Sequence, residues 1–358
     1  MESSPANVKT LISRAGPTAT VVLAAPSATP DAGDQLDVRW RNARSQLAAV
    51  GAPETELDEL DAVAGQLDHG QGAAVVIINS PDGPAWVEYL DDEVTHDLAV
   101  RGELPRLGPV LESRQRSVAH MIVVADRVGA DVIAVDAGSE LESAEVKGSD
   151  LHIHRGHPGG WSQRRFQQRA ENRWEANASD VAEVVIEMAK RAEPRFIALA
   201  GDVRAVTFLL DQLPAELAEI SQKLDGQSPD LIAEQTVRAA ADIVARDTVA
   251  VLEGYKEAVG QGRAATDAAQ TLAALSDGRV ETLLVHDDPD DDRAARFERR
   301  GLACSILDLS ATNSGPSEDL TGRLVDVAIR SAILSDATIR FVSAHAGSPD
   351  GLGAILRW

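Results

Sequence analysis

The last quarter of the chain alternates between helical and strand-like patterns, and this alternation limits the possible folds more than any other feature. Apolar residues recur at helical spacing over 264–278 and 320–336, and strand-like runs cover 280–286, 302–309 and 338–345. A chain that alternates in this way forms a sheet with helices on both faces. The sequence therefore predicts an α/β/α sandwich for residues 266–358.

The first part of the chain mixes the same two kinds of pattern. Pro53 suits the first turn of a helix, and Gly51 ends the preceding one. A strand-like run opens this part, two helical patterns follow it, and three more strand-like runs close it, at 18–28, 34–50, 53–68, 73–80, 84–90 and 95–100. We predict an N-terminal α/β domain over residues 1–117.

The middle of the chain opens with two apolar runs around a short turn that contains Gly129, which predicts a hairpin within 120–138. Apolar residues three or four apart from Phe166 to Ala192 then predict a long helix. A buried strand and two more helices follow, at 195–202, 203–214 and 231–259. The predicted fold class is α/β with three domains: 1–117, a middle domain over 118–265 with a glycine-pair loop and a long helix, and the sandwich over 266–358.

The chain is strongly acidic. Its 358 residues include 34 Lys and Arg against 57 Asp and Glu, which gives a formal net charge of −23. Such a surface repels nucleic acid, so that any contact with RNA has to be local. No run of 18 apolar residues occurs, and the first residues lack the apolar core of a secretion signal. We expect a cytoplasmic protein whose partners include neither a membrane nor DNA.

One segment departs from this acidic character. Between His152 and Trp174 a single acid, Glu171, stands against five arginines, namely Arg155, Arg164, Arg165, Arg169 and Arg173. Three of these are four residues apart, so they form a basic stripe on the predicted helix. The stripe leads into GHPGGWSQRRFQQR, residues 156–169. Its glycine pair lets the backbone approach a ligand closely, but a flexible loop before a helix capped by Ser162 accounts for the pair as well.

The motifs of common enzyme classes are absent: no P-loop, HExxH, paired CxxC or GxSxG occurs. We therefore assign no catalytic residue, no cofactor and no metal. The single cysteine, Cys304, fits a small core hydrophobe in a buried strand better than a nucleophile.

Two further groups of residues leave more than one interpretation open. His152, His154 and His157 are close enough in sequence to bind zinc, but they suit contact with RNA or a plain surface too. The acidic run HDDPDDDR at 286–293 is expected to be a solvated loop, because it lacks the Gly and the distal Glu of a calcium loop.

GHPGGWSQRRFQQR resembles the glycine–glycine–glutamine loop of archaeal and eukaryotic class 1 release factors. In that family a Ser, a short basic stretch with Arg-Phe and a long helix follow the tripeptide, and Ser162, Arg165 and Phe166 stand in the matching places. VVADRVGADVIAV resembles the opening hairpin of the same family's middle domain, and GLGAILRW resembles its C-terminal strand. The likeness covers residues 118–358 and implies a three-domain, release-factor-like architecture. The nearest group is the bacterial relatives of release factor and Pelota, including the Balon-type ribosome hibernation factors.

The chain departs from release factors at the residue that carries the chemistry. In that family the loop glutamine helps a water molecule attack the peptidyl-tRNA ester, and here its position is Trp161. An indole donates one hydrogen bond and has no carbonyl that could accept one from water. It stacks on nucleotide bases instead, a contact worth about 1–3 kcal/mol per base. Gln163 falls in the first helical turn and is a poor replacement, so we expect no hydrolysis. The first domain also lacks the Asn-Ile-Lys-Ser stop-codon motif.

The resemblance implies a translation factor that occupies the ribosomal A site without cutting an ester, in hibernation or stress protection. His157, Gly159, Gly160 and Trp161 would contact rRNA at the peptidyl transferase centre, and the five arginines would contact rRNA phosphates. The first domain would face the decoding centre, and the third would face the stalk base and a GTPase, which in Balon-type factors is elongation factor Tu. Two alternatives stay open: a release or rescue factor that hydrolyses peptidyl-tRNA, and a stress-associated interaction protein without a ribosomal role.

Overall fold

The computed structural model divides the chain into two compact units, residues 1–115 together with 246–358, and residues 116–245. The residues that it describes are 8–25, 32–67, 72–94, 96–126, 129–136, 139–147, 150–155, 174–307, 320–343, 349 and 351–358. We call the first unit the split unit, because it contains both ends of the chain, and the second the central unit. The predicted domain boundaries at 117 and 265 stay predictions.

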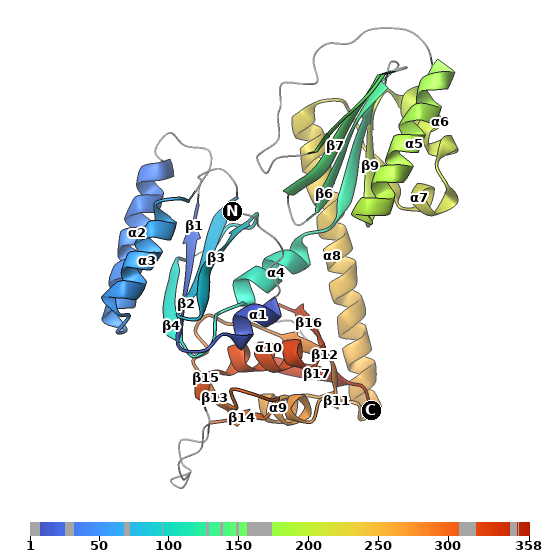
Figure 1. The fold of residues 1–358 in the computed structure, drawn as a ribbon. Coiled ribbons are helices and arrows are strands. Elements are labelled where there is room, and N and C mark those ends of the chain that lie inside the picture. The colour runs from blue at the N-terminus through green and yellow to red at the C-terminus, as the bar shows by residue number, and fades with distance from the viewer. Residues whose placement is uncertain are drawn as a thin grey trace. The chain divides into compact units, whose positions relative to one another are not determined.

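The split unit begins with a four-stranded antiparallel sheet in the order β3-β2-β1-β4 (Figure 1). Its strands and the two helices on its outer face are β1 (Thr18–Ala24), β2 (Ala74–Ser80), β3 (Gly83–Leu90), β4 (Leu98–Gly102), α2 (Ala32–Ala49) and α3 (Glu54–Ala64). Val21 and Ile77 pack against these helices. Val22 and Ile78 point to the other face and join the core of the C-terminal part. Because both faces are covered, β2 is buried along its whole length.

The C-terminal part of the split unit has helices on both faces of a sheet in the order β11-β17-β12-β16. Its elements are β11 (Ala264–Ala265), α9 (Ala268–Ser276), β12 (Val280–Val285), α10 (Leu324–Leu334), β16 (Thr338–Phe341) and β17 (Leu352–Leu356). Leu283 and Val285 pack with α9 and α10 on one face. Leu284 lies on the other face with Tyr255 from the end of α8 (Pro229–Gly260). The layers are thus α/β/α, but the helix on the second face is α8, which lies outside the predicted range of 266–358.

A second, smaller sheet in the order β14-β13-β15 corrects one prediction. Its strands are β13 (Ala294–Phe297), β14 (Cys304–Ile306) and β15 (Leu320–Arg323). The sequence pattern places 320–323 in a helix, but these residues pair with β13, and α10 begins at Leu324. The amide of Leu324 donates to the carbonyl of Arg293 on the neighbouring segment, which fixes the change from strand to helix. Cys304 lies in a strand as predicted and is half-buried.

The central unit contains a six-stranded sheet in the order β10-β9-β5-β6-β7-β8. Its strands are β5 (His120–Ala125), β6 (Gly129–Asp136), β7 (Ser139–Lys147), β8 (Asp150–Arg155), β9 (Phe196–Gly201) and β10 (Ser221–Lys223). β5 and β6 pair antiparallel, which confirms the predicted hairpin. β9 lies parallel to β5 on its other side.

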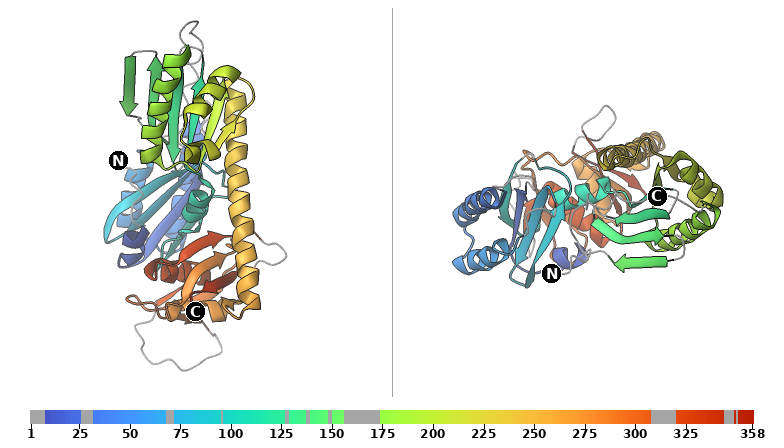
Figure 2. Two further views of the ribbon diagram at one scale, coloured as in Figure 1. Left: turned by 90° about the vertical axis from the view of Figure 1, so that its right-hand side faces the viewer. Right: turned by 90° about the horizontal axis from the view of Figure 1, so that it is seen from above.

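Helices cover both faces of this central sheet (Figures 1 and 2). One face packs against α5 (Trp174–Ala192), α6 (Val203–Gln212) and α7 (Ala215–Glu219), through residues such as Val185 and Leu209. The first half of α8 lies on the other face, where Ile232 and Ile243 contact Ile122. The class of the whole chain is thus α/β with several sheets, as predicted.

Two short helices of the split unit were not predicted. They are α1 (Val8–Ser13), which packs against α10, and α4 (Gly108–Arg116), whose Val110 joins the same core. Among the described residues, no helix is long and apolar enough to cross a membrane.

Candidate functional site

The predicted loop joins β8 to α5. β8 ends at Arg155, and α5 begins at Trp174. His157, Gly159, Gly160, Trp161, Arg164, Arg165, Arg169 and Arg173 lie outside the described residues, as do Ser162 and Gln163. Arg155 is placed by its backbone, opposite Glu142 of β7. The roles predicted for these residues therefore stay predictions.

Strand β7 contacts both elements that lead into the loop. It pairs antiparallel with β8, the last strand of the sheet. Glu142 of β7 also accepts hydrogen bonds from the guanidinium of Arg191, near the end of α5, with Nε and Nη2 at 3.1 Å and 2.9 Å from Oε2. An exposed pair of this kind contributes at most about 1 kcal/mol, so it orients α5 rather than holding it.

No group of three or more His, Cys, Asp or Glu side chains in the described part of the chain could hold a metal ion. The backbone of β8 pairs His152 with Glu145 and His154 with Ser143. His157 lies outside the described residues, so the zinc alternative for the three histidines stays untested.

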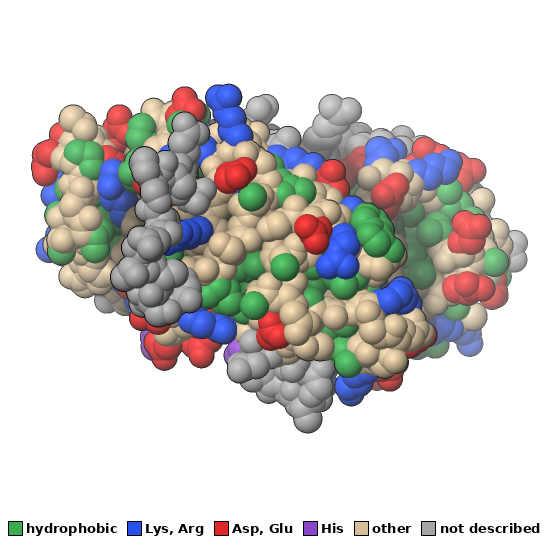
Figure 3. Space-filling view, turned by 90° about the horizontal axis from the view of Figure 1, so that it is seen from below, with side chains coloured by type: hydrophobic (Ala, Val, Ile, Leu, Met, Phe, Trp, Pro, Cys, Tyr) green, Lys and Arg blue, Asp and Glu red, His purple; other side chains and the backbone are tan. Residues whose placement is uncertain are grey.

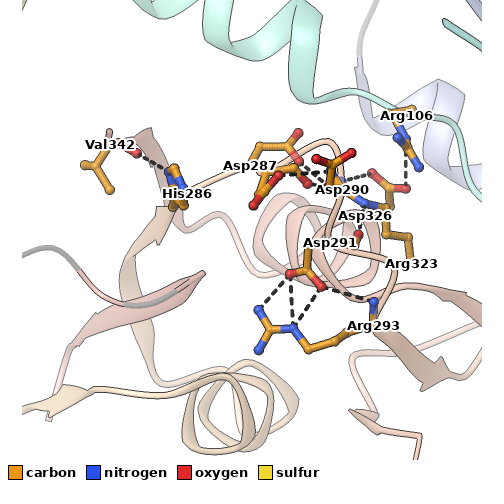
Figure 4. A network of polar contacts seen from close by, with 10 residues as sticks. Arg106, His286, Asp287, Asp290, Asp291, Arg293, Arg323, Asp326 and Val342 are labelled. Atoms are coloured by element: carbon orange, nitrogen blue, oxygen red, sulfur yellow. Dashed lines mark hydrogen bonds and ion pairs between the residues drawn. The ribbon is translucent and has the colours of Figure 1, made fainter. Parts of the chain in front are cut away.

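A buried network of charged side chains lies in the split unit, on elements far apart in the sequence (Figure 4). Asp326, in the first turn of α10, has a side chain that is 7% exposed. Arg106 of the segment before α4 approaches it with Nε 3.7 Å from Oδ2, and Arg323 at the end of β15 with Nη1 3.9 Å from Oδ1. Asp287, just after β12, pairs with Arg323 at 2.6 Å. We call these four residues the acid–arginine network.

Arg323 is the centre of this network. Its Nε donates to the carbonyl of Asp291 at 2.9 Å, and its Nη2 donates to the carbonyl of Asp288 at 2.5 Å. Asp287 in turn lies against Gly108, where a Cβ atom would come within 2.2 Å of Oδ2. A glycine is required at this first position of α4 because the carboxylate occupies the space of a side chain.

Burial controls the titration of Asp326. Its desolvation raises the pKa to about 7, although the positive charges of Arg106 and Arg323 act in the opposite direction. Nearby Asp291 behaves differently, since a hydrogen bond from the exposed Arg293 lowers its pKa. Two cations balance two carboxylates in the acid–arginine network, and it contains no nucleophile, so the arrangement supports a structural role.

The prediction of a solvated acidic loop at 286–293 is wrong for two of its residues. The side chains of Asp287 and Asp291 are 14% and 13% exposed, because they face arginines. Asp288, Asp290 and Asp292 are exposed, as predicted. For Asp287 the missed signal was long-range, since Arg323 is remote from the loop in sequence, whereas Asp291 pairs with Arg293 of the loop itself.

Charge is dispersed on the face of the molecule drawn in Figure 3, where basic side chains are separated by acidic and apolar ones. A surface of this kind offers no broad positive field to a nucleic acid. Contacts with RNA have to depend on a few preorganised residues, as the net charge of −23 already implies.

A family model and a curated protein are similar to this chain. Residues 119–261 match the family model described as bacterial archaeo-eukaryotic release factor family 2. The uncharacterized protein Rv2629 of Mycobacterium tuberculosis (strain ATCC 25618 / H37Rv) is 24% identical over 369 residues, which cover 97% of this chain and 95% of that protein.

Two solved structures are similar at low scores. A model of ribosome-bound archaeal Pelota and ABCE1 has a TM-score of 0.42 and 18% identity, over 80% of this chain and 77% of that one. An archaeal translation termination factor, aRF1, has a TM-score of 0.24 and 15% identity, over 98% and 96%. The chain is therefore similar to the bacterial archaeo-eukaryotic release factors over residues 119–261.

Proposed function

We propose that the protein binds the ribosome in the A site and does not hydrolyse peptidyl-tRNA, so that it protects idle ribosomes during hibernation or stress. One observation carries the proposal. The family match at 119–261 spans the whole loop of residues 156–173, and that loop holds Trp161 after the glycine pair.

The chemistry of Trp161 supports occupation of the site without catalysis. The indole N–H can donate a hydrogen bond to an rRNA group, but the ring offers no acceptor that could orient an attacking water molecule. Its large face suits stacking on an unpaired base. His157, Gly159 and Gly160 complete the segment proposed to lie against rRNA.

Arg155 places a basic residue at the point where the chain passes from β8 into the predicted loop. β8 is the last strand of the central sheet, and Arg155 is its final residue, so residues 156–173 leave from the edge of the sheet. We assign Arg155, Arg164, Arg165, Arg169 and Arg173 to rRNA phosphates. Elongation factor Tu is the GTPase partner proposed for the C-terminal part.

Sedimentation with vacant ribosomes tests the binding. The full chain is expected to sediment with ribosomes at low salt, and the double variant Arg164→Glu/Arg165→Glu is expected to stay in the supernatant. The control is Arg41→Glu/Lys256→Glu, which reverses two exposed cations of the split unit and gives the same net charge. Equal sedimentation of the loop variant and the control would overturn the assignment of the loop arginines. Absence of wild-type binding would leave the stress-associated interaction protein as the better explanation.

Release of a labelled peptide from stalled ribosomes tests the absence of hydrolysis. The wild type is expected to release no more peptide than buffer does. Release by the wild type that survives Trp161→Ala would establish the rescue-factor alternative, because catalysis would then proceed without a contribution from the indole.

A further inference from the structure

The hairpin between β13 and β14 carries two adjacent arginines at its tip, in a chain whose net charge is −23. Its tip, residues 298–303, carries Arg299 and Arg300, which are both exposed. Arg299 pairs with Glu103 at 3.0 Å, whereas the side chain of Arg300 has no ion pair or hydrogen bond with any described residue. The carboxylate of Glu298 lies close to Gly301. We call residues 298–303 the basic tip.

A buried cation supports the basic tip from below. Arg330 of α10 is 3% exposed, and its Nη2 and Nη1 donate to the carbonyls of Arg299 at 2.7 Å and Gly301 at 3.1 Å. Its guanidinium also lies over the ring of Phe297, 5.1 Å from the centroid. These contacts hold the tip backbone in one shape, with Gly301 at a φ of +121°.

Arg330 is unusual because no carboxylate of the described residues pairs with it. A buried charge normally has a partner of opposite sign, since desolvation is expensive. Among the described residues its charge is met by carbonyl dipoles and an aromatic ring, and burial, with a smaller contribution from the charge of Arg299, lowers the pKa of Arg330. An uncompensated charge in a low-dielectric interior extends its field into the solvent above it.

The outer face of the small sheet adds hydrogen-bond donors beside the basic tip. Ala295 and Phe297 of β13 point into the core, so Arg296 between them faces the opposite side. Its partners on the neighbouring strands are Ser305 and Thr321, and both are exposed. Ser and Thr hydroxyls are among the donors that proteins use on nucleic-acid phosphates.

We infer that the basic tip and the outer face of the β14-β13-β15 sheet form a second RNA contact, which binds backbone phosphates through Arg299 and Arg300. The inference rests on the proposed function, because it assigns a further ribosomal contact to a part of the chain outside the family match. Charge complementarity selects the partner: this surface has Arg296, Arg299 and Arg300 against Glu298 and Glu103, and the buried Arg330 beneath it, whereas the whole chain has a net charge of −23.

The test measures the affinity of the full chain for vacant ribosomes as a function of salt. Each phosphate contact that is lost lowers the slope of log affinity against log salt by about one. Arg299→Gln/Arg300→Gln is therefore expected to weaken binding at low salt and to lower the slope by about two. The difference from the wild type should then shrink about tenfold between about 50 and about 200 mM salt. Arg41→Gln/Lys256→Gln, with the same net charge, should retain the wild-type slope.

The outcomes separate this inference from the proposed function. If the wild type binds ribosomes and the tip variant has the slope of the control, the basic tip is not an RNA contact while the proposed function stands. If the wild type does not bind, both fail. A photoreactive residue at Ala303, exposed beside the tip, should crosslink to RNA, and crosslinks to protein alone would overturn the assignment to RNA. Thermal unfolding verifies that the variants fold, as the tip backbone is held by Arg330.

Discussion

Two arginines of the split unit, seven positions apart in sequence, are buried in opposite electrostatic settings. Arg323 precedes α10, and its side chain is 8% exposed between the carboxylates of Asp287 and Asp326. Arg330 lies within α10, is 3% exposed and contacts two carbonyl oxygens and the ring of Phe297, but no carboxylate of the residues that the structure describes. The first guanidinium is neutralised inside the protein, and the second is not.

The difference shows that arginine can have two roles in an acidic chain, one in stability and one in binding. In the acid–arginine network, opposite charges cancel over a short range, so that little field reaches the solvent and the interaction holds chain segments together. Under the basic tip, no carboxylate of the described residues cancels the charge of Arg330, and its hydrogen bonds hold the tip backbone; both favour attraction of an anion. We therefore predict that the acid–arginine network determines the stability of the fold and that the basic tip determines RNA binding.

Loss of the neutralised arginine is expected to have the largest effect on stability. Arg323→Met leaves Asp287 with no cation, leaves Asp326 with Arg106 alone, and removes hydrogen bonds to two loop carbonyls. Removing one partner of a buried pair destabilises by about 3–5 kcal/mol. Urea unfolding checks this value. Arg238→Met, which breaks the exposed pair with Glu234 on α8, should change the free energy of unfolding by less than about 1 kcal/mol. Equal losses for the two variants would show that the network is not a structural centre.

The free energy of unfolding is expected to depend on pH through Asp326 of the acid–arginine network. Its pKa is about 7 in the folded chain against 3.8 ordinarily, so between these values the folded state keeps a proton that the unfolded state has lost. The free energy of unfolding therefore falls as pH rises from about 4 to about 7, and this group adds no further change above that. The full difference amounts to about 4 kcal/mol.

The variant Asp326→Asn isolates this contribution. The wild type should lose stability relative to the variant as pH rises through the range, as measured by urea unfolding at several pH values. Exposed Asp336 provides a control of opposite sign, because a hydrogen bond from Lys9 lowers its pKa. Relative to Asp336→Asn, the wild type should gain stability as pH rises. A pH-independent difference for Asp326→Asn would contradict the assigned titration.

The fold could be predicted where local pattern and burial agree. The hairpin of β5 and β6 follows from two apolar runs around Gly129, and α8 follows from one long helical pattern. Residues 320–323 could not be assigned from local pattern. Their apolar spacing continues into α10, and only the pairing with β13 makes them a strand.

Among the polar sites, too, only those that depend on local sequence could be predicted. The loop at 156–173 was predicted from a motif, which is local by nature, and it lies within the residues that match the family model. The acid–arginine network joins Arg106 to Asp326 through the packing of distant segments, so no spacing in the sequence could indicate it. Arg330 was equally hidden, because an arginine inside an apolar helix pattern gives no sign of the carbonyls that it contacts.

The smallest of these stability effects is expected at Arg330. Arg330→Met removes two hydrogen bonds to tip carbonyls, but it also removes a buried charge that lacks a carboxylate partner. Methionine can fill much of the space over Phe297, so we expect a loss of about 1–3 kcal/mol, less than for Arg323→Met. Hydrogen exchange should show faster exchange at the amide of Glu298, which bonds to the carbonyl of Ala303 across the hairpin, and no change in β12. If the Arg330 variant were as unstable as the Arg323 variant, the buried cation would be a structural centre like the first. The positive potential of Arg330 at the basic tip would then be a consequence of its structural role and no evidence for binding.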